Sequence, residues 1–347
     1  MLEIKHTLCP SCSVGCGINV VLKEGEVVGS FPYKRHPVNE GKNCLNGRNS
    51  IEEYKNKLKK ATISNSETDI NKAIDEIKKE LSSADASTVT VICSGNNSVE
   101  EIEAIKDFAE SNDYTVGFYA DNLKNIESIA SYEDIENAKK IAVIGDILYE
   151  NPLIGRRIVH AKQNGAAICA FGAEKSVTKN IADDYATDSI QEFLDANKDN
   201  LDETALIIFN EIDTQENLDK INSIVEESNC KVLPVYSKSN TKGTFNFLDS
   251  KSAEEMIEIL DNTKILLVFN DDIVDEIDYD YSRISKIISF VCCENDTTEI
   301  SDIVVPIKAW LEKDGSFINA MGETQNFKAV VESDVLSEIE IIEKLKE

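Results

Sequence analysis

Beyond residue 60, the chain alternates between stretches with helical apolar spacing and short runs of continuous apolar residues. In the first helical stretch, 69–81, apolar residues recur three and four positions apart, as they do on the buried face of an amphipathic helix. The continuous runs are rich in Ile and Val, which is typical of parallel strands buried on both faces. The predicted helices are 69–81, 98–111, 155–164, 189–199, 214–227, 252–261 and 334–346. The predicted strands are 88–93, 141–145, 166–171, 205–209, 231–236, 264–269, 287–293 and 302–307.

This alternation predicts an α/β fold, because strands that alternate with helices form βαβ units with a parallel sheet. Eight strands over this length indicate two Rossmann-like, doubly wound sheets rather than one. The first 60 residues differ, since segments 17–22 and 27–31 flank Lys23-Glu-Gly-Glu26 and predict a small β-hairpin. The expected domains are a small N-terminal β-rich domain, 1–56, a discontinuous α/β domain, 57–135 with 233–347, and a second α/β domain, 136–232.

The charged residues divide the chain at the same place. The 347 residues carry 64 Asp and Glu against 36 Lys and Arg, a formal net charge of −28. Residues 1–60 hold ten basic and six acidic side chains, so a head of net charge +4 precedes a body of −32. Such asymmetry is typical of neighbouring units with different functions, although a solvated acidic surface would give the same count. The acidic body argues against binding of nucleic acid.

Membrane insertion is not expected either. No apolar run approaches the roughly 20 residues that a membrane-spanning helix requires. The first residues, Met1-Leu-Glu-Ile-Lys-His6, contain no apolar stretch of the signal-peptide kind. We therefore expect a soluble, cytoplasmic protein.

The nine cysteines follow the division between head and body. An odd number in an intracellular protein argues against a disulfide framework. Four lie in the head, at Cys9, Cys12, Cys16 and Cys44. The other five lie in or beside predicted buried strands, where cysteine acts as a small hydrophobic residue. They are Cys93, Cys169, Cys230, Cys292 and Cys293.

The head cysteines have the spacing of a metal site. Three lie within eight positions, in Cys9-Pro-Ser-Cys12-Ser-Val-Gly-Cys16, and Cys44 follows after 27 intervening residues. Neighbouring glycines allow tight turns that point backbone N–H groups at sulfur. Four thiolates can hold either zinc or a [4Fe–4S] cubane. Zinc ribbons usually present two paired Cys-x2-Cys knuckles, so the spacing favours the cubane, with zinc as the alternative.

On these residues the head resembles the iron–sulfur segment of molybdopterin oxidoreductases, most closely that of the formate dehydrogenase α-subunits of methanogens. The matching stretch runs from Cys9 through the hairpin 20–28 and the segment 34–42 to Cys44. The resemblance implies a doubly wound fold, a [4Fe–4S] cluster on the four cysteines, and molybdopterin guanine dinucleotide with Mo or W. It continues along the chain, in order, at 135–145, 150–157, 240–244, 302–306 and 312–319.

Several departures from the family pattern bear on function. The family ligates Mo or W with a Cys or selenocysteine from the interval that corresponds to 111–134, and here that interval contains no Cys, His or Arg. Asn46 stands where the family has a Lys between cluster and pterin. Phe171-Gly-Ala173 replaces an Asp-Pro-Arg that helps to hold the guanine, and a Pro-Gly-Thr-Asp run is missing near 186–189. From the resemblance, we also expect this chain to lack the family's C-terminal β-barrel domain.

The remaining candidates for pterin binding are Gly145, Asp146 and Arg156. Gly145 and Asp146 end a predicted strand at a position where such folds bind nucleotides, and Arg156 opens the next helix, where a phosphate could lie. An ordinary strand-to-helix turn and a solvated helix face explain the same residues. The departures therefore place bound molybdopterin guanine dinucleotide, with Mo or W, in doubt.

A complete cysteine set beside a missing metal ligand predicts an iron–sulfur electron-transfer subunit without its own formate-oxidising site. One alternative is a catalytic Mo- or W-pterin oxidoreductase of the formate dehydrogenase type with an unusual metal site. Another is a structural or regulatory module, in which cluster or zinc only holds the head together. The expected partners are redox protein subunits of a larger complex, with the acidic body facing a basic subunit.

Overall fold

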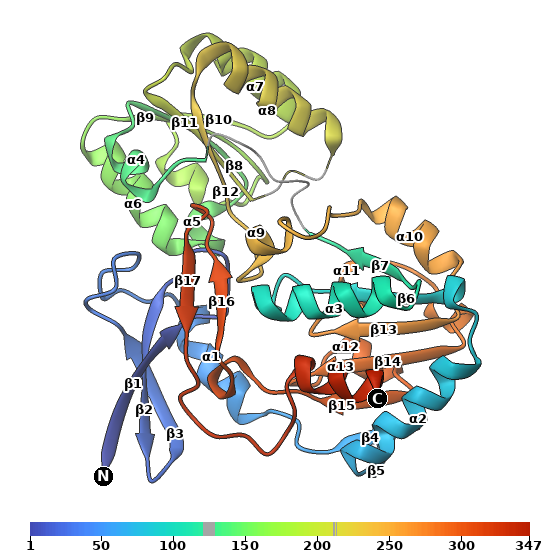
Figure 1. Cartoon of the computed structure of the whole chain (residues 1–347). Helices are drawn as coiled ribbons and strands as arrows, with labels where there is room; N and C mark the ends of the chain where they lie inside the picture. Colours follow the sequence, from blue (N-terminus) through green and yellow to red (C-terminus); the bar gives the residue numbers. More distant parts are fainter. Residues whose placement is uncertain (121–128, 211, 213) are drawn as a thin grey trace.

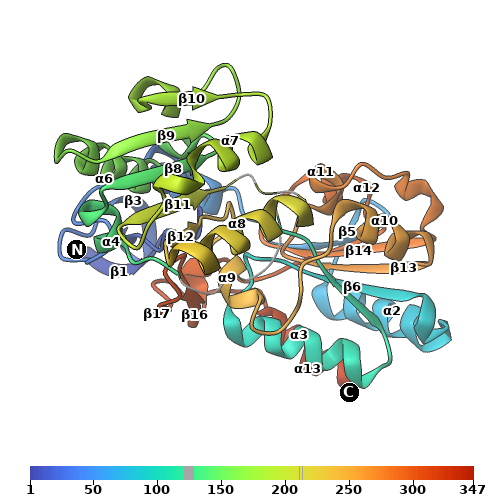
Figure 2. The same cartoon turned by 90° about the horizontal axis from the view of Figure 1, so that it is seen from above.

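The computed structural model describes residues 1–120, 129–210, 212 and 214–347 (Figure 1). Its framework consists of a three-stranded antiparallel sheet in the head, two larger sheets that carry helices, and a two-stranded hairpin. Figure 1 shows the five-stranded sheet above the head and the seven-stranded sheet beside both, and the view from above separates the two larger sheets (Figure 2). The predicted α/β fold class is therefore confirmed.

The head sheet has the order β1 (Leu2–Leu8), β2 (Gly17–Lys23), β3 (Glu26–Pro32), and α1 (Leu45–Lys55) follows it. Strands β2 and β3 form the predicted hairpin. Its turn places Glu24 and Gly25 at positive φ, 56° and 88°, as two-residue turns of type I′ require. The sequence did not predict β1, because five of its seven residues are exposed and it has no buried apolar run.

The five-stranded sheet is parallel throughout, with the order β10-β9-β8-β11-β12. The chain enters at the central strand β8, adds two strands on one side and then two on the other. The carboxyl ends of β8 and β11 therefore border a crevice of the kind that binds ligands in doubly wound folds. The strands are β8 (Lys140–Ile144), β9 (Ala167–Phe171), β10 (Asp184–Ala186), β11 (Ala205–Phe209) and β12 (Lys231–Pro234). The helices are α4 (Tyr132–Asn137), α5 (Ile147–Glu150), α6 (Pro152–Gln163), α7 (Ile190–Asn197) and α8 (Gln215–Ser228).

The seven-stranded sheet combines an early and a late part of the chain, in the order β5-β4-β15-β14-β13-β6-β7. The five strands from β15 to β7 in this order are parallel to one another. Strands β4 and β5 add an antiparallel edge. The strands are β4 (Ala61–Ile63), β5 (Ser66–Thr68), β6 (Val89–Cys93), β7 (Thr115–Phe118), β13 (Ile265–Phe269), β14 (Lys286–Val291) and β15 (Ile303–Pro306). The helices are α2 (Ile70–Ser83), α3 (Val99–Ser111), α9 (Thr241–Thr244), α10 (Ala253–Asp261), α11 (Ile273–Glu276), α12 (Asp296–Ile300) and α13 (Glu338–Lys346).

A two-stranded hairpin, β16 (Gly315–Ile318) and β17 (Thr324–Phe327), lies between the head and the seven-stranded sheet (Figure 1). Strand β17 lies against β1, while β16 lies against α3. Leu8 of β1 packs with Phe317 and Phe327 in one buried apolar cluster. The hairpin therefore joins the head to the body through side chains from both ends of the chain.

All eight predicted strands are present close to their predicted limits, and each predicted helix corresponds to an observed one. The last helix begins at Glu338 rather than at 334, because Ser337 caps it and forms a capping box with Glu340. The predicted domain limits stay a prediction. Within the part of the chain that the structure describes, no helix is long and apolar enough to cross a bilayer.

Candidate metal centre

Three of the four head cysteines lie on the loop that joins β1 to β2. Cys9 directly follows β1 and Cys16 directly precedes β2, and the backbone N–H of Cys9 donates to the carbonyl of Cys16 over 2.8 Å. Gly15, at φ 75°, lets the chain turn back just before Cys16. This bond extends the β1–β2 ladder by one step and closes a short loop that contains Cys12. The close spacing in the sequence therefore brings the three thiols together.

Cys44 reaches the same place from the start of α1. The backbone N–H of Gly47 lies 3.4 Å from the Cys44 sulfur and donates to it. A Cβ added at Gly47 would lie 3.2 Å from the Cys9 sulfur and 2.4 Å from Oδ1 of Asn43. The first turn of α1 can therefore lie against Cys9 only because position 47 has no side chain.

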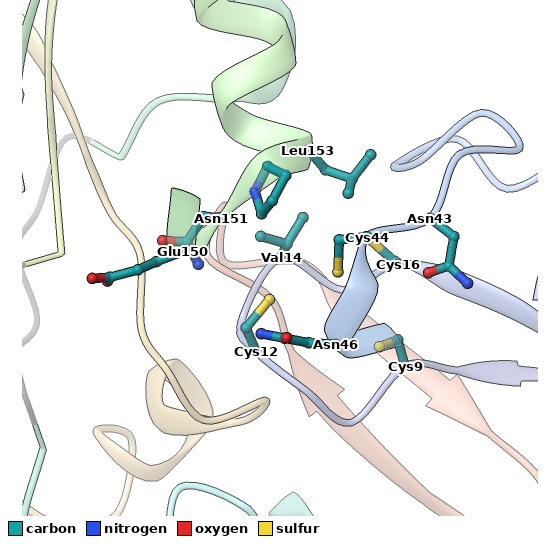
Figure 3. A pocket seen from close by; sticks show the side chains of 11 residues that line it. Cys9, Cys12, Val14, Cys16, Asn43, Cys44, Asn46, Glu150, Asn151 and Leu153 are labelled. Atoms are coloured by element: carbon teal, nitrogen blue, oxygen red, sulfur yellow. The ribbon is translucent and has the colours of Figure 1, made fainter. Parts of the chain in front are cut away.

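All four cysteines line one pocket (Figure 3). It contains about 380 Å³ of empty space, including the part open to solvent. The rest of its wall comes from the cysteine loop, from the start of α1 with the residues before it, and from the end of α5 with the start of α6. It is made of apolar and amide side chains with one carboxylate. These residues are Val14, Asn43, Asn46, Glu150, Asn151, Pro152 and Leu153. The pocket therefore lies between the head and the five-stranded sheet.

The spread of the four sulfurs bears on the group that they could hold. Zinc bound by four thiolates needs each sulfur about 2.3 Å from one point. Among residues 1–120, 129–210, 212 and 214–347, no three Cys, His, Asp or Glu side chains converge closely enough for a single metal ion. A pocket lined by four separated thiols fits a polynuclear group such as a [4Fe–4S] cubane better than zinc.

The thiols are held in a poorly hydrated environment. Desolvation raises the pKa of the half-buried Cys12 to about 12, and neighbouring Cys9 adds to the shift. Desolvation also raises the pKa of Cys16, with Cys12 next in effect, while Arg157 acts in the opposite direction. Thiolates bind metals and thiols do not, so loading of this site releases protons. A positively charged metal group offsets the cost of burying several thiolates together.

The cysteine loop is fixed to the five-stranded sheet. Ser13 is fully buried, its N–H donates to the carbonyl of Tyr236 over 3.1 Å, and its Oγ accepts from the N–H of Tyr236 over 2.8 Å. The hydroxyl of Tyr132 donates to the carbonyl of Val14 over 2.8 Å. Because these contacts act on the backbone between Cys12 and Cys16, they fix the positions of both sulfurs.

The β16–β17 hairpin holds the same loop from the other side. The N–H of Ala320 donates to the carbonyl of Ser13 over 2.7 Å, and Nε2 of Gln325 donates to the carbonyl of Gly15 over 3.1 Å. The segment 312–319, which carries part of the sequence resemblance, builds the first strand of this hairpin. Its role in the structure is thus to connect the cysteine loop with the seven-stranded sheet.

A second cavity continues from the cysteine pocket along the carboxyl edge of the five-stranded sheet. It contains about 930 Å³ of empty space, including the part open to solvent. Its described lining contains Glu150 but no Lys, Arg or His. The lining residues come from the head and from the loops that follow β8, β11 and β12, and they are Ser11, Cys12, Cys44, Leu45, Asn46, Tyr149, Glu150, Asn151, Pro152, Asn210 and Ser237.

The three residues predicted for pterin binding line neither of these cavities. Gly145 directly follows β8 and has φ 97°. The carboxylate of Asp146 accepts hydrogen bonds of 2.9 Å from the N–H groups of Val177 and Thr178, so it orders the loop after β9. Arg156 instead pairs with Glu40 of the head at 3.4 Å. In the structure, Asp146 and Arg156 thus each bond to other parts of the chain.

The interval 111–134, in which the family's metal ligand was expected, is only partly described. Strand β7 ends at Phe118 and α4 begins at Tyr132, but residues 121–128 lie outside the described residues. The prediction that this interval supplies no ligand to Mo or W therefore rests on its sequence and stays a prediction.

Sequence reasoning missed the amide side chains that surround the cysteines. Asn43 and Asn151 line the cysteine pocket, and Asn210 lines the second cavity. Asn210 directly follows the predicted strand 205–209, and polar residues at the carboxyl ends of parallel strands commonly form sites, so this signal was present. No comparable local signal marks Asn43, because its place in the pocket depends on how α1 packs against Cys9.

The fold and the site define a class of protein in which a four-cysteine head is joined to two doubly wound sheets. Two family models match this chain. The Molybdopterin oxidoreductase Fe4S4 domain matches residues 2–56, and Molybdopterin oxidoreductase matches residues 31–345. The chain belongs to the molybdopterin oxidoreductase family, which confirms the resemblance seen in its sequence.

Similar curated proteins come from methanogens. The chain is 32% identical over 202 residues to F420-dependent formate dehydrogenase 2 subunit alpha of Methanococcus maripaludis. It is also 32% identical over 208 residues to F420-dependent formate dehydrogenase subunit alpha of Methanocaldococcus jannaschii. The matches cover 52% and 53% of this chain but only 30% of each relative. The chain is thus related to formate dehydrogenase alpha subunits over a limited part of their length.

Solved structures share the fold at low sequence identity. Acetylene hydratase from Pelobacter acetylenicus matches with a TM-score of 0.69 and 11% identity, over 98% of this chain and 68% of that one. A chain of the formyltransferase/hydrolase complex (FhcABCD) from Methylorubrum extorquens matches with a TM-score of 0.58 and 11% identity, over 82% of this chain and 97% of that one. At this identity the likeness establishes the fold alone.

Proposed function

We propose that this chain is an iron–sulfur electron-transfer subunit related to the formate dehydrogenase α-subunit, without a formate-oxidising site of its own. Its ligands are Cys9, Cys12, Cys16 and Cys44, and its cofactor is a [4Fe–4S] cluster. The observation that carries this proposal is the single pocket lined by all four sulfurs, within the segment that matches the Fe4S4 domain. When bound, such a cluster accepts and releases single electrons.

The residues around the sulfurs supply the surroundings that a redox cluster needs. Cys9 and Cys16 are buried, and Val14 and Leu153 cover the pocket with apolar surface. The N–H of Gly47 donates to the Cys44 sulfur and offsets its negative charge. Low hydration and few, fixed hydrogen bonds are among the features that set the potential of a cluster.

The cavity beside the cysteines is poorly suited to an anionic substrate. Formate is an anion, and the phosphates of a pterin dinucleotide are anionic too. The described lining of this cavity contains Glu150 and no basic side chain, and Asn46 stands where the family has a Lys. The interval 111–134 adds no Cys, His or Arg. These features favour electron transfer over formate oxidation.

A second candidate function is a catalytic oxidoreductase that holds molybdopterin guanine dinucleotide with Mo or W in an unusual site. The position of the second cavity favours it, because this cavity adjoins Cys12 and Cys44 and follows the carboxyl ends of β8 and β11. Oδ1 of Asn210 is buried there without a hydrogen-bond partner among the described residues. Two contacts count against this candidate, because they occupy residues predicted to bind the pterin. Asp146 accepts a hydrogen bond from Thr178, and Arg156 pairs with Glu40.

We propose redox protein subunits as partners. The related proteins are named as alpha subunits, which supports assembly of this chain into a larger complex. The sequence gives the head a net charge of +4 and the body −32, so different faces would attract partners of opposite charge. A cytoplasmic location remains a prediction.

Chemical analysis of the protein purified from its native host tests the proposal. We expect about four iron and four sulfide per chain, without Mo, W or released pterin. A stoichiometric content of Mo or W with pterin would instead support the catalytic candidate. Stoichiometric zinc without iron would exclude electron transfer and support a structural or regulatory role for the head.

Substitution of one ligand separates electron transfer from a purely structural role. In Cys44→Ser, loss of electron flow through the complex with the fold intact supports our proposal. A destabilised head with unchanged electron flow would support a cluster or zinc that only holds the head together. Cys230→Ala is the matched control, since Cys230 is buried but lies outside the pocket.

A further inference from the structure

Asn151 occupies the N-cap position of α6, where an Asn side chain usually accepts a hydrogen bond from the first turn of the helix. Here it makes no such bond. The residue is only 4% exposed, so water cannot readily satisfy its carboxamide. Its side chain is therefore used for contacts outside its own helix.

Two neighbours account for the position of the Asn151 carboxamide. Nδ2 of Asn210, at the end of β11, donates to Oδ1 of Asn151 over 3.3 Å. Asn151 and Cys12 also line the same side of the cysteine pocket, where the nitrogen of the Asn151 carboxamide faces Cys12 (Figure 3). With its oxygen held by Asn210, the amide presents its N–H groups as donors to the sulfur.

We propose that Asn151 donates a hydrogen bond to the sulfur of Cys12 and thereby raises the reduction potential of the cluster, with Asn210 as the positioning residue. This inference rests on the proposed function, because it requires a cluster on Cys12. The five-stranded sheet thus controls the redox behaviour of a cluster whose ligands all belong to the head.

The direction of the effect follows from charge. Reduction adds negative charge to the cluster and its sulfurs, so a donor to sulfur stabilises the reduced form more than the oxidised form. Without the donor, the midpoint potential becomes more negative. Water does not replace the donor, because the site of the Asn151 side chain is almost completely closed to solvent.

The test is a potentiometric titration of the iron-loaded, full-length protein, followed by EPR. Asn151→Leu keeps the number and branching of the side-chain heavy atoms but removes the donor. We expect a more negative midpoint, with the one-electron equilibrium changed about tenfold, which corresponds to about 59 mV. Asn210→Ala leaves Asn151 in place but frees its orientation, and we expect a smaller shift of the same sign.

Asn46→Leu is the matched control. Asn46 lines the same pocket, but it is exposed and makes no hydrogen bond to a cysteine among the described contacts. Its replacement should shift the midpoint much less than Asn151→Leu does. An equal shift in this control would overturn the inference, since the effect would then come from the general polarity of the pocket.

The outcomes separate the inference from the proposed function. A wild-type protein that gives no cubane signal would contradict the proposed function. Wild type and Asn151→Leu that both load iron and share one midpoint would overturn the inference alone. If Asn151→Leu does not fold, an unchanged midpoint in Asn210→Ala would likewise overturn the inference alone. A folded Asn151→Leu without a cluster also counts against it, because we assign Asn151 to potential, not to assembly.

Discussion

Ser13 forms two hydrogen bonds with the backbone of Tyr236, although 223 positions separate the two residues in the sequence. The first residue lies between Cys12 and Cys16, and the second follows β12 of the five-stranded sheet. Both are fully buried. This pair ties the cysteine loop to the body and makes the geometry of the pocket depend on the folding of the whole chain.

Ser13→Ala should therefore destabilise the protein and loosen the site. The N–H of Tyr236 would remain buried without its acceptor, which costs about 1–3 kcal/mol in the free energy of unfolding. Urea denaturation measures this change, and the rate of iron loss to a chelator should rise. Ser82→Ala, at an exposed position of helix α2, is the control, with an expected change within about 0.5 kcal/mol. Equal stability of the two variants would contradict the role of this pair.

Gly47→Ala should reduce cluster loading with little loss of secondary structure. The added Cβ would meet Oδ1 of Asn43 at 2.4 Å and the Cys9 sulfur at 3.2 Å, so α1 must move away from the ligands. The iron content after reconstitution measures the effect. Gly29→Ala is the control, because a Cβ there has no neighbour within 4 Å. The account would be wrong if both variants loaded iron as well as the wild type.

Asn46→Lys should raise the midpoint potential of the cluster. A positive charge in the wall of both cavities stabilises the reduced, more negative form. Redox titration compares Asn46→Lys with Asn71→Lys, which adds the same charge on the exposed surface of α2. A midpoint that rises equally in both variants, or that falls in Asn46→Lys, would argue against a cluster beside Asn46.

Lys313→Met should strongly destabilise the body. Nζ of Lys313 lies 2.6 Å from Glu101 and 3.0 Å from Glu338, and all three side chains are almost completely buried. Loss of the cation leaves the buried carboxylate of Glu101 uncompensated, at a cost of about 3–5 kcal/mol. Lys328→Met is the control, since Lys328 forms an exposed pair with Asp314. Thermal and urea unfolding should distinguish the two variants; similar stabilities would refute the importance of the buried group.

Glu338 gives this group a defined pH dependence. Burial, with the nearby Glu101 carboxylate next in effect, raises the pKa of Glu338 from 4.5 to about 8. A raised carboxyl pKa means that the folded state binds the proton more tightly, so this contribution to stability is complete below pH 4.5 and is lost as the pH rises through about 8.

Glu338→Gln should remove that dependence. Relative to wild type, the variant should gain stability between pH 5 and pH 9. Urea unfolding at a series of pH values measures the difference, and Glu103→Gln on the exposed side of α3 serves as the control. A pH-independent difference for Glu338→Gln would show that Glu338 does not carry a raised pKa.

Much of this architecture can be predicted from the sequence, because it is specified locally. The continuous Ile- and Val-rich runs predict the parallel strands that are buried on both faces in the two larger sheets. Strand β1 has mostly exposed residues and gives no such signal. The short edge strands β4, β5 and β10 have only three residues each, too few for a periodic pattern.

The candidate site is predictable to a similar extent. Three cysteines within eight positions, on a hairpin, must lie near one another, and the structure brings Cys44 to them. Their role as cluster ligands stays a prediction. Pairs such as Asn151 and Cys12, or Ser13 and Tyr236, lie more than a hundred positions apart in the sequence, so no local pattern specifies them.

The EPR spectrum of the reduced protein, purified from its native host, tests the central claim most directly. The account predicts the signal of one reduced [4Fe–4S] cluster, without a signal from pterin-bound Mo or W, and loss of the cluster signal in Cys12→Ser. A spectrum without a cubane signal, or one with a Mo or W signal from the same chain, would contradict it.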